Sequence, residues 1–440
     1  MREKYEVVIV GAGVLGVTIA FWLSCLTKCS IAVLDKEARV AAHTSSRNTG
    51  VIHRPFYLNP EKKRVFARAA QKSYFLWRSL ARQFQLAWSQ VGTLEVAIGD
   101  SQFPTLNQYR EWALQNGMGE KEVELLDAPS VKTLEPLVEC KGAIYSKTDT
   151  AVNYGELTSC MSELSIKNGV EFLMGHKVVR AQENSRGVTL EIGSHSDELA
   201  SIACGFLINA AGGNSMDIAH SMGLAKNYTD LHFRGEYWKV EPEFGIKVMR
   251  NIYSVARHTE FPFLDPHFIV RADGWREVGP NAVLVSGPNA YTGLSSTKSE
   301  LLKKLVERPN YPKLRLFSSS QFLSLVWQEW RSSISKQAMC NRVRRFIPTM
   351  RVAQLRNRGL SGVRSSVIDR SGFVSEAVVI ERESSLHILN YNSPGATGAP
   401  AYSAYLVGKL LAEGRLKTSG TETAGIAQKI GWDFASAADL

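Results

Sequence analysis

Short apolar runs and glycine-rich turns alternate at the start of the chain. Val7–Val10 is a β-branched run, and Val17–Leu26 carries apolar residues at helical spacing. A second apolar run, Ile31–Leu34, ends on the acidic residue Asp35. This pattern predicts a strand, a helix that follows a tight turn, and a second strand.

Further along, the hydrophobic period switches repeatedly between the values typical of helices and of strands. We expect helices over residues 61–90, 103–118, 155–168, 216–222 and 401–413, and a largely helical stretch over 298–345. We expect strands over residues 92–98, 123–126, 142–145, 170–173, 177–180, 188–192, 202–207 and 386–389, and mostly strand from 232 to 285. The polar end of the chain, from about 418 to 440, is expected to lie on the surface or to be disordered.

The composition is that of a large globular protein. Hydrophobic residues make up 44% of the 440 positions, which is enough to bury a sizeable core. The chain has no apolar run long enough for a transmembrane helix, and it enters its first strand too early for a signal or transit peptide. We therefore expect a cytoplasmic protein. The six cysteines form neither a CxxC pair nor a Cys/His ligand spacing, so we expect no metal site.

The formal net charge of +10 narrows the classes of partner. Such a charge suits nucleic acid, an anionic membrane surface or an acidic substrate. The basic residues are scattered, apart from small clusters at 62–64 and 342–345, and no nucleic-acid-binding module is visible. We therefore expect no nucleic-acid partner. A solvated basic surface is the first interpretation, and peripheral contact with an anionic membrane face is the second.

The turn between the first strand and the first helix has the sequence Gly11-Ala12-Gly13-Val14-Leu15-Gly16. Gly11 allows the tight turn, Gly13 lets the backbone approach a pyrophosphate, and Gly16 lets the helix lie close to the sheet. The helix N-terminus offers N–H groups and a partial positive charge to phosphates. Asp35 is placed to accept hydrogen bonds from ribose hydroxyls, which disfavours NADP. The segment therefore predicts a dinucleotide site.

A long polar segment, His43–His53, follows the second strand. It is too polar for a core element and too long for a simple turn, and it can run along a cofactor from its phosphates to its reactive ring. A nicotinamide enzyme has no need of such a segment, so FAD is the expected dinucleotide. Two later glycine turns, at residues 210–215 and 392–398, each lead into a helix and are expected beside the same cofactor.

Three N-terminal segments, Gly11–Gly16, Leu34–Glu37 and Asn48–His53, resemble those of a known family. They are similar to the FAD-dependent oxidoreductases of the D-amino-acid-oxidase superfamily. Within it, the chain most resembles the L-2-hydroxyglutarate dehydrogenase/oxidase family, over residues 5–415. The segments that carry this narrower resemblance are Phe233–Tyr237, Phe261–Leu264, His267-Phe268, Asp273-Gly274, Val278–Ala282, Phe346–Pro348, Gly362–Arg364, Asp369–Gly372 and Ser393–Thr397.

The resemblance implies non-covalently bound FAD and oxidation of L-2-hydroxyglutarate to 2-oxoglutarate by hydride transfer to flavin N5. The segments and the resemblance together predict a set of FAD contacts. The residues in that set are Gly11, Gly13, Val14, Leu15, Gly16, Asp35, Lys36, Thr44, Ser45, Arg47, Asn48, Gly50, Val51, Val178, Ala211, Gly212, Gly362, Arg364, Gly395, Ala396 and Thr397.

The expected fold class is α/β (α+β overall), with a Rossmann-like FAD-binding domain interleaved with a mixed-sheet substrate domain. The FAD-binding domain is expected to comprise residues 1–90, 150–225 and 345–418, and the substrate domain residues 91–149 and 226–344. Residues 419–440 are expected to form a C-terminal tail.

Several residues depart from the family pattern. Arg47 stands where the family often has His, and Arg cannot form the covalent flavin link known among relatives. Arg54-Pro55 replaces a Ser-Gly pair after His53. The remaining departures are Ser361, Ser365-Ser366 and Leu389–Tyr391. We expect these residues close to the substrate pocket, so the substrate could differ from 2-hydroxyglutarate.

Oxidation of a 2-hydroxy acid needs a base for the hydroxyl proton and cations for the carboxylates. His53 and His267 are the candidate bases, because a neutral imidazole suits the role; a third alternative is that neither acts. The candidate substrate ligands are Arg234, Tyr237, Tyr253, Arg271 and Arg364; the alternative for each arginine is a structural ion pair, and for each tyrosine simple packing. Arg364 is favoured because the resemblance brings its segment to the flavin.

Three hypotheses for the function stay open. The first is a flavin dehydrogenase or oxidase of a small, anionic 2-hydroxy acid. The second is an enzyme of the same superfamily with a different substrate. It would be an amino-acid or amine oxidase of the glycine, sarcosine or proline type, or a glycerol-3-phosphate dehydrogenase. The third is a flavoprotein that serves assembly of a partner complex without turnover. For an enzyme, the electron acceptor would be oxygen or a quinone, and a quinone at the inner face of a membrane would suit the basic surface.

Overall fold

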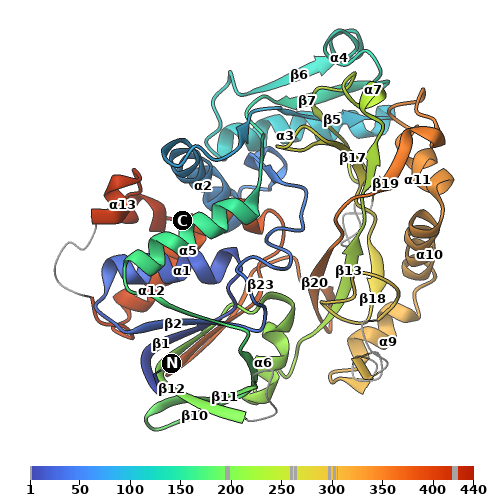
Figure 1. Cartoon of the computed structure of the whole chain (residues 1–440). Coiled ribbons are helices and arrows are strands. Elements are labelled where there is room, and N and C mark those ends of the chain that lie inside the picture. The colour runs from blue at the N-terminus through green and yellow to red at the C-terminus, as the bar shows by residue number, and fades with distance from the viewer. Residues whose placement is uncertain are drawn as a thin grey trace.

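The structure is a computed structural model, which describes residues 2–193, 199–257, 261, 265–295, 299–300, 304, 306–418 and 425–440. A mixed sheet forms one side of the molecule, at the lower left of Figure 1. Its strands, in spatial order, are β10 (Lys177–Asn184), β11 (Gly187–Gly193), β12 (Leu199–Asn209), β1 (Lys4–Val10), β2 (Ile31–Asp35) and β9 (Glu171–Met174), with β23 (Ser385–Asn390) beside β12 and β22 (Val378–Arg382) beside β23. β1 runs parallel to β12 and β2, so the carboxyl ends of these three strands meet at one edge of the sheet.

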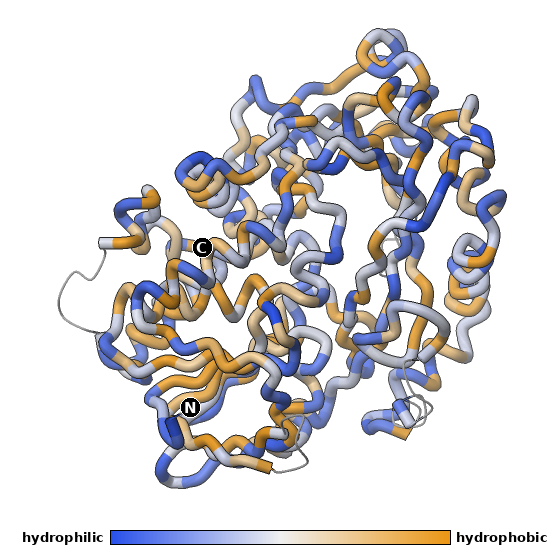
Figure 2. Tube along the Cα trace, viewed as in Figure 1, coloured by the Kyte–Doolittle hydropathy of each residue, from blue (hydrophilic) through white to orange (hydrophobic). Residues whose placement is uncertain are grey.

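Val7–Val10 of β1 and Ile31–Leu34 of β2 are continuous apolar runs, drawn orange in Figure 2, because both faces of this part of the sheet are covered. Val7 and Ile9 of β1 share one core with the helices on the first face, and Val8 shares another with β10–β12 on the second. The helices on the first face are α1 (Val14–Leu26), α2 (Arg64–Gln83), α5 (Tyr154–Lys167) and α12 (Gly395–Ala412). Helix α6 (Ser215–Ser221) follows β12.

Residues 425–440 pack on the helical layer as a surface segment, so of the two alternatives predicted for the tail, surface or disorder, disorder was wrong for these residues. This segment contains α13 (Gly425–Lys429) and α14 (Phe434–Ala438). Between them, Trp432 is 1% exposed; its Nε1 donates to the carbonyl of Leu76 (2.9 Å), and its ring meets Phe21 edge-on at 5.4 Å between centroids. A few apolar residues are enough to pack a short segment against the protein. They are easily overlooked in the sequence, because the segment as a whole is polar.

Two further sheets form the upper and right-hand parts of Figure 1. The strands of the larger sheet are β19 (Leu355–Arg358), β14 (Trp238–Val240), β17 (Arg276–Gly279), β16 (His267–Val270), β15 (Asn251–Ser254), β5 (Thr93–Ala97), β7 (Gly142–Ser146) and β6 (Val123–Asp127). Those of the smaller, antiparallel sheet are β18 (Val283–Val285), β13 (Thr229–Gly235), β20 (Gly362–Asp369) and β21 (Gly372–Phe373). The helices of these parts are α3 (Phe103–Gln115), α4 (Ala128–Leu134), α7 (Pro242–Gly245), α9 (Tyr311–Phe317), α10 (Ser320–Ile334) and α11 (Lys336–Val343).

A small antiparallel sheet aligns two segments that are distant in the sequence. Its strands are β3 (Val51–Ile52), β8 (Thr150–Val152) and β4 (Trp88–Ser89). Ile52 pairs with Thr150, so the residue after β3 lies beside the residue before β8. The remaining short helices are η1 (Pro55–Tyr57), η2 (Asp100–Gln102), η3 (Gly212–Asn214) and η4 (Val352–Gln354).

The element types agree with the sequence prediction over most of the described chain, and the main differences lie at boundaries. The helix predicted over 61–90 is α2, which ends at Gln83, and the helix predicted from 401 begins at Gly395. β19 and β20 belong to the second and third sheets although they fall within 345–418, the range predicted for the FAD-binding domain. We propose that this domain resumes at β22. Within the residues that the structure describes, no helix combines the length and apolarity needed to cross a membrane.

Candidate cofactor and active site

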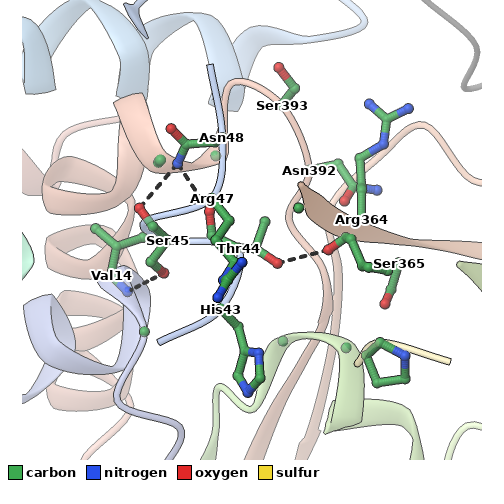
Figure 3. Close-up of a pocket in the computed structure, with 18 of the residues that line it drawn as sticks. Val14, His43, Thr44, Ser45, Arg47, Asn48, Arg364, Ser365, Asn392 and Ser393 are labelled. Atoms are coloured by element: carbon green, nitrogen blue, oxygen red, sulfur yellow. Dashed lines mark hydrogen bonds between the residues drawn. The ribbon is translucent and has the colours of Figure 1, made fainter. Parts of the chain in front are cut away.

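A cavity of about 360 Å³ opens at the edge where β1, β2 and β12 end. Its walls come from segments far apart in the sequence, some of which Figure 3 shows. They are the turn after β1, residues 41–53, the turn after β12, the loop at 280–289, β20 and the stretch from the end of β23 to the start of α12. All four segments that the sequence predicted to surround a dinucleotide therefore meet at one cavity.

The glycines of the first turn are required by close backbone contacts. Gly11 has φ +109°, and a Cβ there would lie 2.4 Å from the carbonyl oxygen of Ala210. A Cβ on Gly16 would lie 1.9 Å from the carbonyl oxygen of Gly11. Both distances are shorter than any real Cβ contact, so a side chain at either position would force the turn away from the sheet.

Two helices, α1 and α12, begin at the cavity, and among the described residues no side chain caps either N-terminus from its N-cap position. Ser45 Oγ accepts the N–H of Val14 at 2.9 Å, as Figure 3 shows. Helix N-termini carry partial positive charge and N–H donors, which suit a phosphate. Asp35 lines the same cavity, and its carboxylate is fixed by the N–H groups of Ala12 (2.7 Å) and Glu37 (2.9 Å). Phosphate-binding and ribose-binding groups are thus arranged in the order a dinucleotide requires.

The polar segment after β2 is held in a defined conformation by its own side chains. Thr44 Oγ1 donates to the carbonyl of Val363 in β20 (2.8 Å), and Asn48 Nδ2 donates to the carbonyls of Thr44 and Ser45 (both 3.1 Å; Figure 3). Arg47 lines the cavity with its guanidinium over the ring of Tyr291 (4.4 Å). The segment therefore connects the first sheet to β20 along one wall of the cavity.

Four residues of the predicted FAD set, Gly16, Lys36, Gly50 and Val178, do not line the cavity. Gly16 and Gly50 support its walls by close backbone packing, and Lys36 Nζ donates to Asn214 (3.0 Å) and Asn289 (3.1 Å), which do line it. Burial lowers the pKa of Lys36. Val178 lies on β10 and packs into the apolar cluster on the far face of the sheet, so its side chain has a packing contact there instead.

His53, at the end of the polar segment, also lines the cavity. Its Nδ1 lies 3.0 Å from Asp149 Oδ2, and its Nε2 lies 3.4 Å from the Tyr253 hydroxyl. The His53 side chain is 13% exposed, whereas Asp149 is fully buried. A carboxylate only accepts hydrogen bonds, so this geometry puts the ring proton on Nδ1 and leaves Nε2 with a lone pair.

Asp149 accepts hydrogen bonds from several directions. Oδ1 accepts the Ser146 hydroxyl (2.5 Å) and the N–H of Arg54 (3.1 Å), and Oδ2 accepts the Thr93 hydroxyl (2.9 Å) as well as His53. The sequence analysis missed this role, because only the β3–β8 pairing brings Asp149 to His53, 96 positions earlier in the chain.

Two buried side chains surround this pair without reaching the cavity. His267 is 4% exposed and its ring stacks on that of Tyr253 at 3.7 Å between centroids; its Nδ1 has no hydrogen-bond partner among the described residues. Burial, followed by the nearby His53, lowers the pKa of His267 to about 3. Burial, with Asp149 adding to it, raises the pKa of Glu95 on β5 to about 8. His267 and Glu95 are therefore both uncharged near neutral pH.

The structure separates the three candidate arginines. Arg234 is 2% exposed and is held by Glu236 (2.9 Å), and Arg271 is held by Glu277 and the carbonyl of Asn48. Neither lines the cavity, whereas Arg364 of β20 does. Burial lowers the pKa of Arg364, an effect that the nearby Tyr237 opposes.

Of the two candidate tyrosines, Tyr237 lines the cavity with its ring under the guanidinium of Arg271 (4.7 Å), and Tyr253 lies behind His53. Burial raises the pKa of Tyr237 to about 12 and that of Tyr253 well above its usual range, so both hydroxyls stay protonated. The structure thus brings His53, Tyr237 and Arg364 together at the cavity, and places His267, Tyr253, Arg234 and Arg271 in the shell around it.

A family profile described as "FAD dependent oxidoreductase" (DAO) matches residues 6–412. The chain belongs to this FAD-dependent oxidoreductase family. The residues at the cavity fit its cofactor: the glycine turn, two helix N-termini and Asp35 provide the groups that a dinucleotide needs. FAD is therefore the cofactor of this oxidoreductase.

Relatives and solved structures resemble the chain over nearly its whole length. It is 29% identical over 423 residues to "L-2-hydroxyglutarate dehydrogenase, mitochondrial" of Nematostella vectensis, covering 92% of this chain and 90% of that protein. It is 26% identical over 409 residues to "L-2-hydroxyglutarate dehydrogenase" of Escherichia coli (strain K12), with coverage of 92% and 93%. An FAD-bound L-α-glycerophosphate oxidase from Mycoplasma pneumoniae has the same fold, with a TM-score of 0.73, 20% identity and coverage of 96% and 98%.

Some of this oxidoreductase's departures from the family pattern lie away from the cavity. Arg54 is fully buried and forms a two-pronged ion pair with Glu122 (2.7 and 3.2 Å), with further bonds to Thr148 (2.7 Å) and Gln71 (2.8 Å). Its side chain therefore supports the framework behind His53, and the expectation that it would lie close to the substrate pocket was wrong. Pro55 begins η1.

The other departures divide between the cavity and its surroundings. Arg47, Ser365, Leu389 and Tyr391 line the cavity, whereas Ser361, Ser366 and Asn390 do not. Of the segment 261–264, which carries part of the family resemblance, residues 262–264 lie outside the described residues. No group of three or more potential metal ligands occurs within the described residues.

Proposed function

We propose that this oxidoreductase converts L-2-hydroxyglutarate to 2-oxoglutarate. The observation that carries the proposal is its likeness, over about nine-tenths of both chains, to proteins named L-2-hydroxyglutarate dehydrogenase. A cavity that joins the cofactor turn to His53 and Arg364 supports it, because a dicarboxylate with a reactive hydroxyl needs a base and a cation beside the flavin.

His53 is the base in this proposal. Its Nε2 lone pair accepts the proton of the substrate hydroxyl, and Asp149 holds Nδ1–H so that the ring keeps this tautomer and orientation. FAD, when bound, provides the acceptor for the hydride from the substrate's α-carbon. His267 is the weaker candidate, because it lies behind Tyr253 and its lowered pKa makes it a poor proton acceptor.

Arg364 is the proposed ligand of a substrate carboxylate, with Tyr237 beside it. A guanidinium can hold a carboxylate through two parallel hydrogen bonds, and in a buried site such a charged pair is stronger than in water. The carboxylates of Glu236 and Glu277 already hold Arg234 and Arg271, so these two arginines shape the wall.

The electrons leave the reduced enzyme to a quinone or to oxygen in this proposal. A quinone acceptor would place the enzyme at the cytoplasmic face of a membrane, which the net charge of +10 favours. Comparing turnover with oxygen and with a soluble quinone analogue separates the two.

The proposal is tested by adding candidate substrates anaerobically to the purified, FAD-loaded protein and following the visible flavin absorbance. We expect L-2-hydroxyglutarate to bleach the flavin and to yield 2-oxoglutarate, and its D-enantiomer, glycine, sarcosine, L-proline and glycerol 3-phosphate to leave it oxidised. Bleaching by an amino acid or by glycerol 3-phosphate alone would assign a different substrate within the superfamily. Bound FAD with no bleaching by any compound would favour an assembly role without turnover.

The assignment of the base is tested with His53→Ala and, as its matched comparison, His267→Ala. We expect His53→Ala to bind FAD and to be reduced by L-2-hydroxyglutarate on the order of 10²–10⁴-fold more slowly, which is the usual contribution of a general base. His267→Ala should stay within tenfold of the wild-type rate. The reverse order of the two variants would transfer the role to His267, and wild-type rates in both would remove it from either residue.

A further inference from the structure

The outer faces of α9 and α10 expose large apolar side chains. Tyr311 and Leu314 of α9 are 63% and 66% exposed, and Trp327 and Ile334 of α10 are 63% and 72% exposed. Leu323, one turn before Trp327, is 45% exposed. Soluble surfaces normally carry such residues singly, so their concentration on two consecutive helices indicates an interaction surface.

The exposed residues form a stripe because of their helical spacing. Leu323, Trp327 and Ile334 are separated by four and seven positions, which places them on one side of α10, and Arg331 lies between the last two. The opposite side of α10 buries Phe322 and its neighbours against the antiparallel sheet. Helix α10 thus has two apolar faces: the inner one packs in the core, and the outer one is exposed.

The exposed charges on this stretch of chain are of one sign. Within the described residues 306–337, the exposed charged residues are Arg308, Arg315 and Arg331. The acidic residues of the stretch 306–337 are Glu307 and Glu329, and both turn inward to ion pairs: Glu307 with Lys313 (2.7 Å) and Glu329 with Arg342 (2.9 Å). Beyond Glu329, the sequence contains no further acid before Asp369.

We propose that the outer face of α9 and α10 docks on the surface of an anionic phospholipid bilayer. Tyr and Trp favour the headgroup region of a bilayer, Leu and Ile reach the acyl chains, and Arg binds the anionic headgroups. A symmetric dimer through this face would instead bring Arg308, Arg315 and Arg331 of two copies together without exposed acids to pair with them. The charge pattern therefore selects a lipid surface over a second copy of the chain.

The docking face is separated from the cavity by a single sheet. Phe322 and Leu325, on the inner side of α10, pack in one cluster with Phe233 of β13, and Phe233 lines the cavity. In Figure 1, α9 and α10 lie on the outer right-hand side of the molecule, with β13, β18 and β20 inside them. Docking of this face on lipid would thus turn the sheet that contains β13 toward the bilayer. This orientation does not depend on which substrate the cavity accepts.

The test is co-sedimentation of the FAD-loaded enzyme with vesicles of phosphatidylcholine, and with vesicles of equal parts phosphatidylcholine and phosphatidylglycerol. We expect sedimentation with the mixed vesicles only. Because each basic residue near an anionic surface is worth about 1 kcal/mol, the triple variant Arg308→Gln/Arg315→Gln/Arg331→Gln should bind on the order of a hundredfold more weakly. Trp327→Ser/Ile334→Ser should also weaken binding, and the fluorescence of Trp327 should be quenched by brominated lipids.

The matched control makes the same change of charge on α2, through Arg64→Gln/Arg78→Gln/Arg82→Gln, at exposed arginines far from α9 and α10 in Figure 1. This control should bind as the wild type does. Equal loss in both triple variants would show that net charge alone drives binding and would overturn the proposed face. So would a wild type that binds neither vesicle, or one that is a dimer in solution and becomes a monomer when Trp327 is changed to Ser.

Discussion

Changing Asp149 to Asn tests how the structure prepares His53. Each oxygen of the Asp149 carboxylate accepts two hydrogen bonds, and Oδ2 serves His53 Nδ1 (3.0 Å) and the Thr93 hydroxyl (2.9 Å). In the amide side chain of the Asp149→Asn variant, an NH₂ donor replaces one of these oxygens. The remaining oxygen is retained by the N–H of Arg54 (3.1 Å) and the Ser146 hydroxyl (2.5 Å), both of which donate to Oδ1, so the NH₂ faces His53.

A donor at this position reverses the tautomer of His53. Nδ1 must then accept a hydrogen bond, so the ring proton moves to Nε2, the nitrogen that accepts the substrate's proton in the proposed function. His53 can no longer take the substrate's hydroxyl proton without first losing its own. General-base catalysis is worth on the order of 10²–10⁴-fold in rate, and we expect Asp149→Asn to lose most of it. The loss should appear in kcat, because no substrate contact is removed.

The assay is anaerobic stopped-flow reduction of the bound flavin by L-2-hydroxyglutarate across a range of pH. We expect a slow variant with normal FAD content and little change in the substrate concentration at half-saturation. Thr93→Val is the matched control, because it removes another donor to Oδ2 and leaves the His53 contact in place; its rate should stay within tenfold of wild type. If Asp149→Asn retains FAD and reduces at the wild-type rate, His53 does not depend on Asp149 and the proposed chemistry fails.

Three further changes test other parts of the site and fold. Arg364→Lys should raise KM for L-2-hydroxyglutarate on the order of tenfold while FAD stays bound, because an ammonium cannot make two parallel bonds to a carboxylate; unchanged steady-state kinetics would contradict this. Burial favours the protonated form of Glu95 in the folded protein, so the stability that this preference contributes is complete below pH 4.5 and is lost as pH rises through about 8. Glu95→Gln should therefore flatten the decline in the urea-measured free energy of unfolding across that window, a decline of at most about 5 kcal/mol; an equal decline in both proteins would refute the burial argument. Trp432→Ala should lower the free energy of unfolding by about 3–5 kcal/mol, because it opens a cavity in the helical layer; a loss under 1 kcal/mol would mean that the C-terminal helices contribute little.

The cofactor half of the site could be predicted from the sequence because its signals are local. Gly11–Gly16 and Asp35 belong to a single strand–helix–strand unit, in which spacing along the chain determines position in space. The turn at Gly395–Thr397 was also recognised as a cofactor turn, although its helix begins six residues earlier than expected, at Gly395 itself. Small residues there carry a weak helical signal in sequence.

The reactive half could be predicted only in part because its contacts are long-range. His53 was recognised from its place at the end of a local segment, but its partner Asp149 depends on a two-residue strand pairing that has no local signature. Arg54 looked like a change in the pocket because it follows His53 directly. Its side chain extends toward Glu122, in the turn before β6, which supplies its counter-charge. The choice among Arg234, Arg271 and Arg364 likewise depended on which of them the fold places at the cavity.

The most direct test of the account is a single-turnover experiment with the wild-type enzyme. FAD-loaded protein is mixed anaerobically with a slight excess of L-2-hydroxyglutarate, and flavin absorbance and 2-oxoglutarate are measured in the same sample. We predict full bleaching with one 2-oxoglutarate formed per flavin, and a slower reaction when the hydrogen on the substrate's α-carbon is replaced by deuterium. An enzyme that holds FAD but leaves it oxidised, or bleaches it without forming 2-oxoglutarate, would contradict the proposed function.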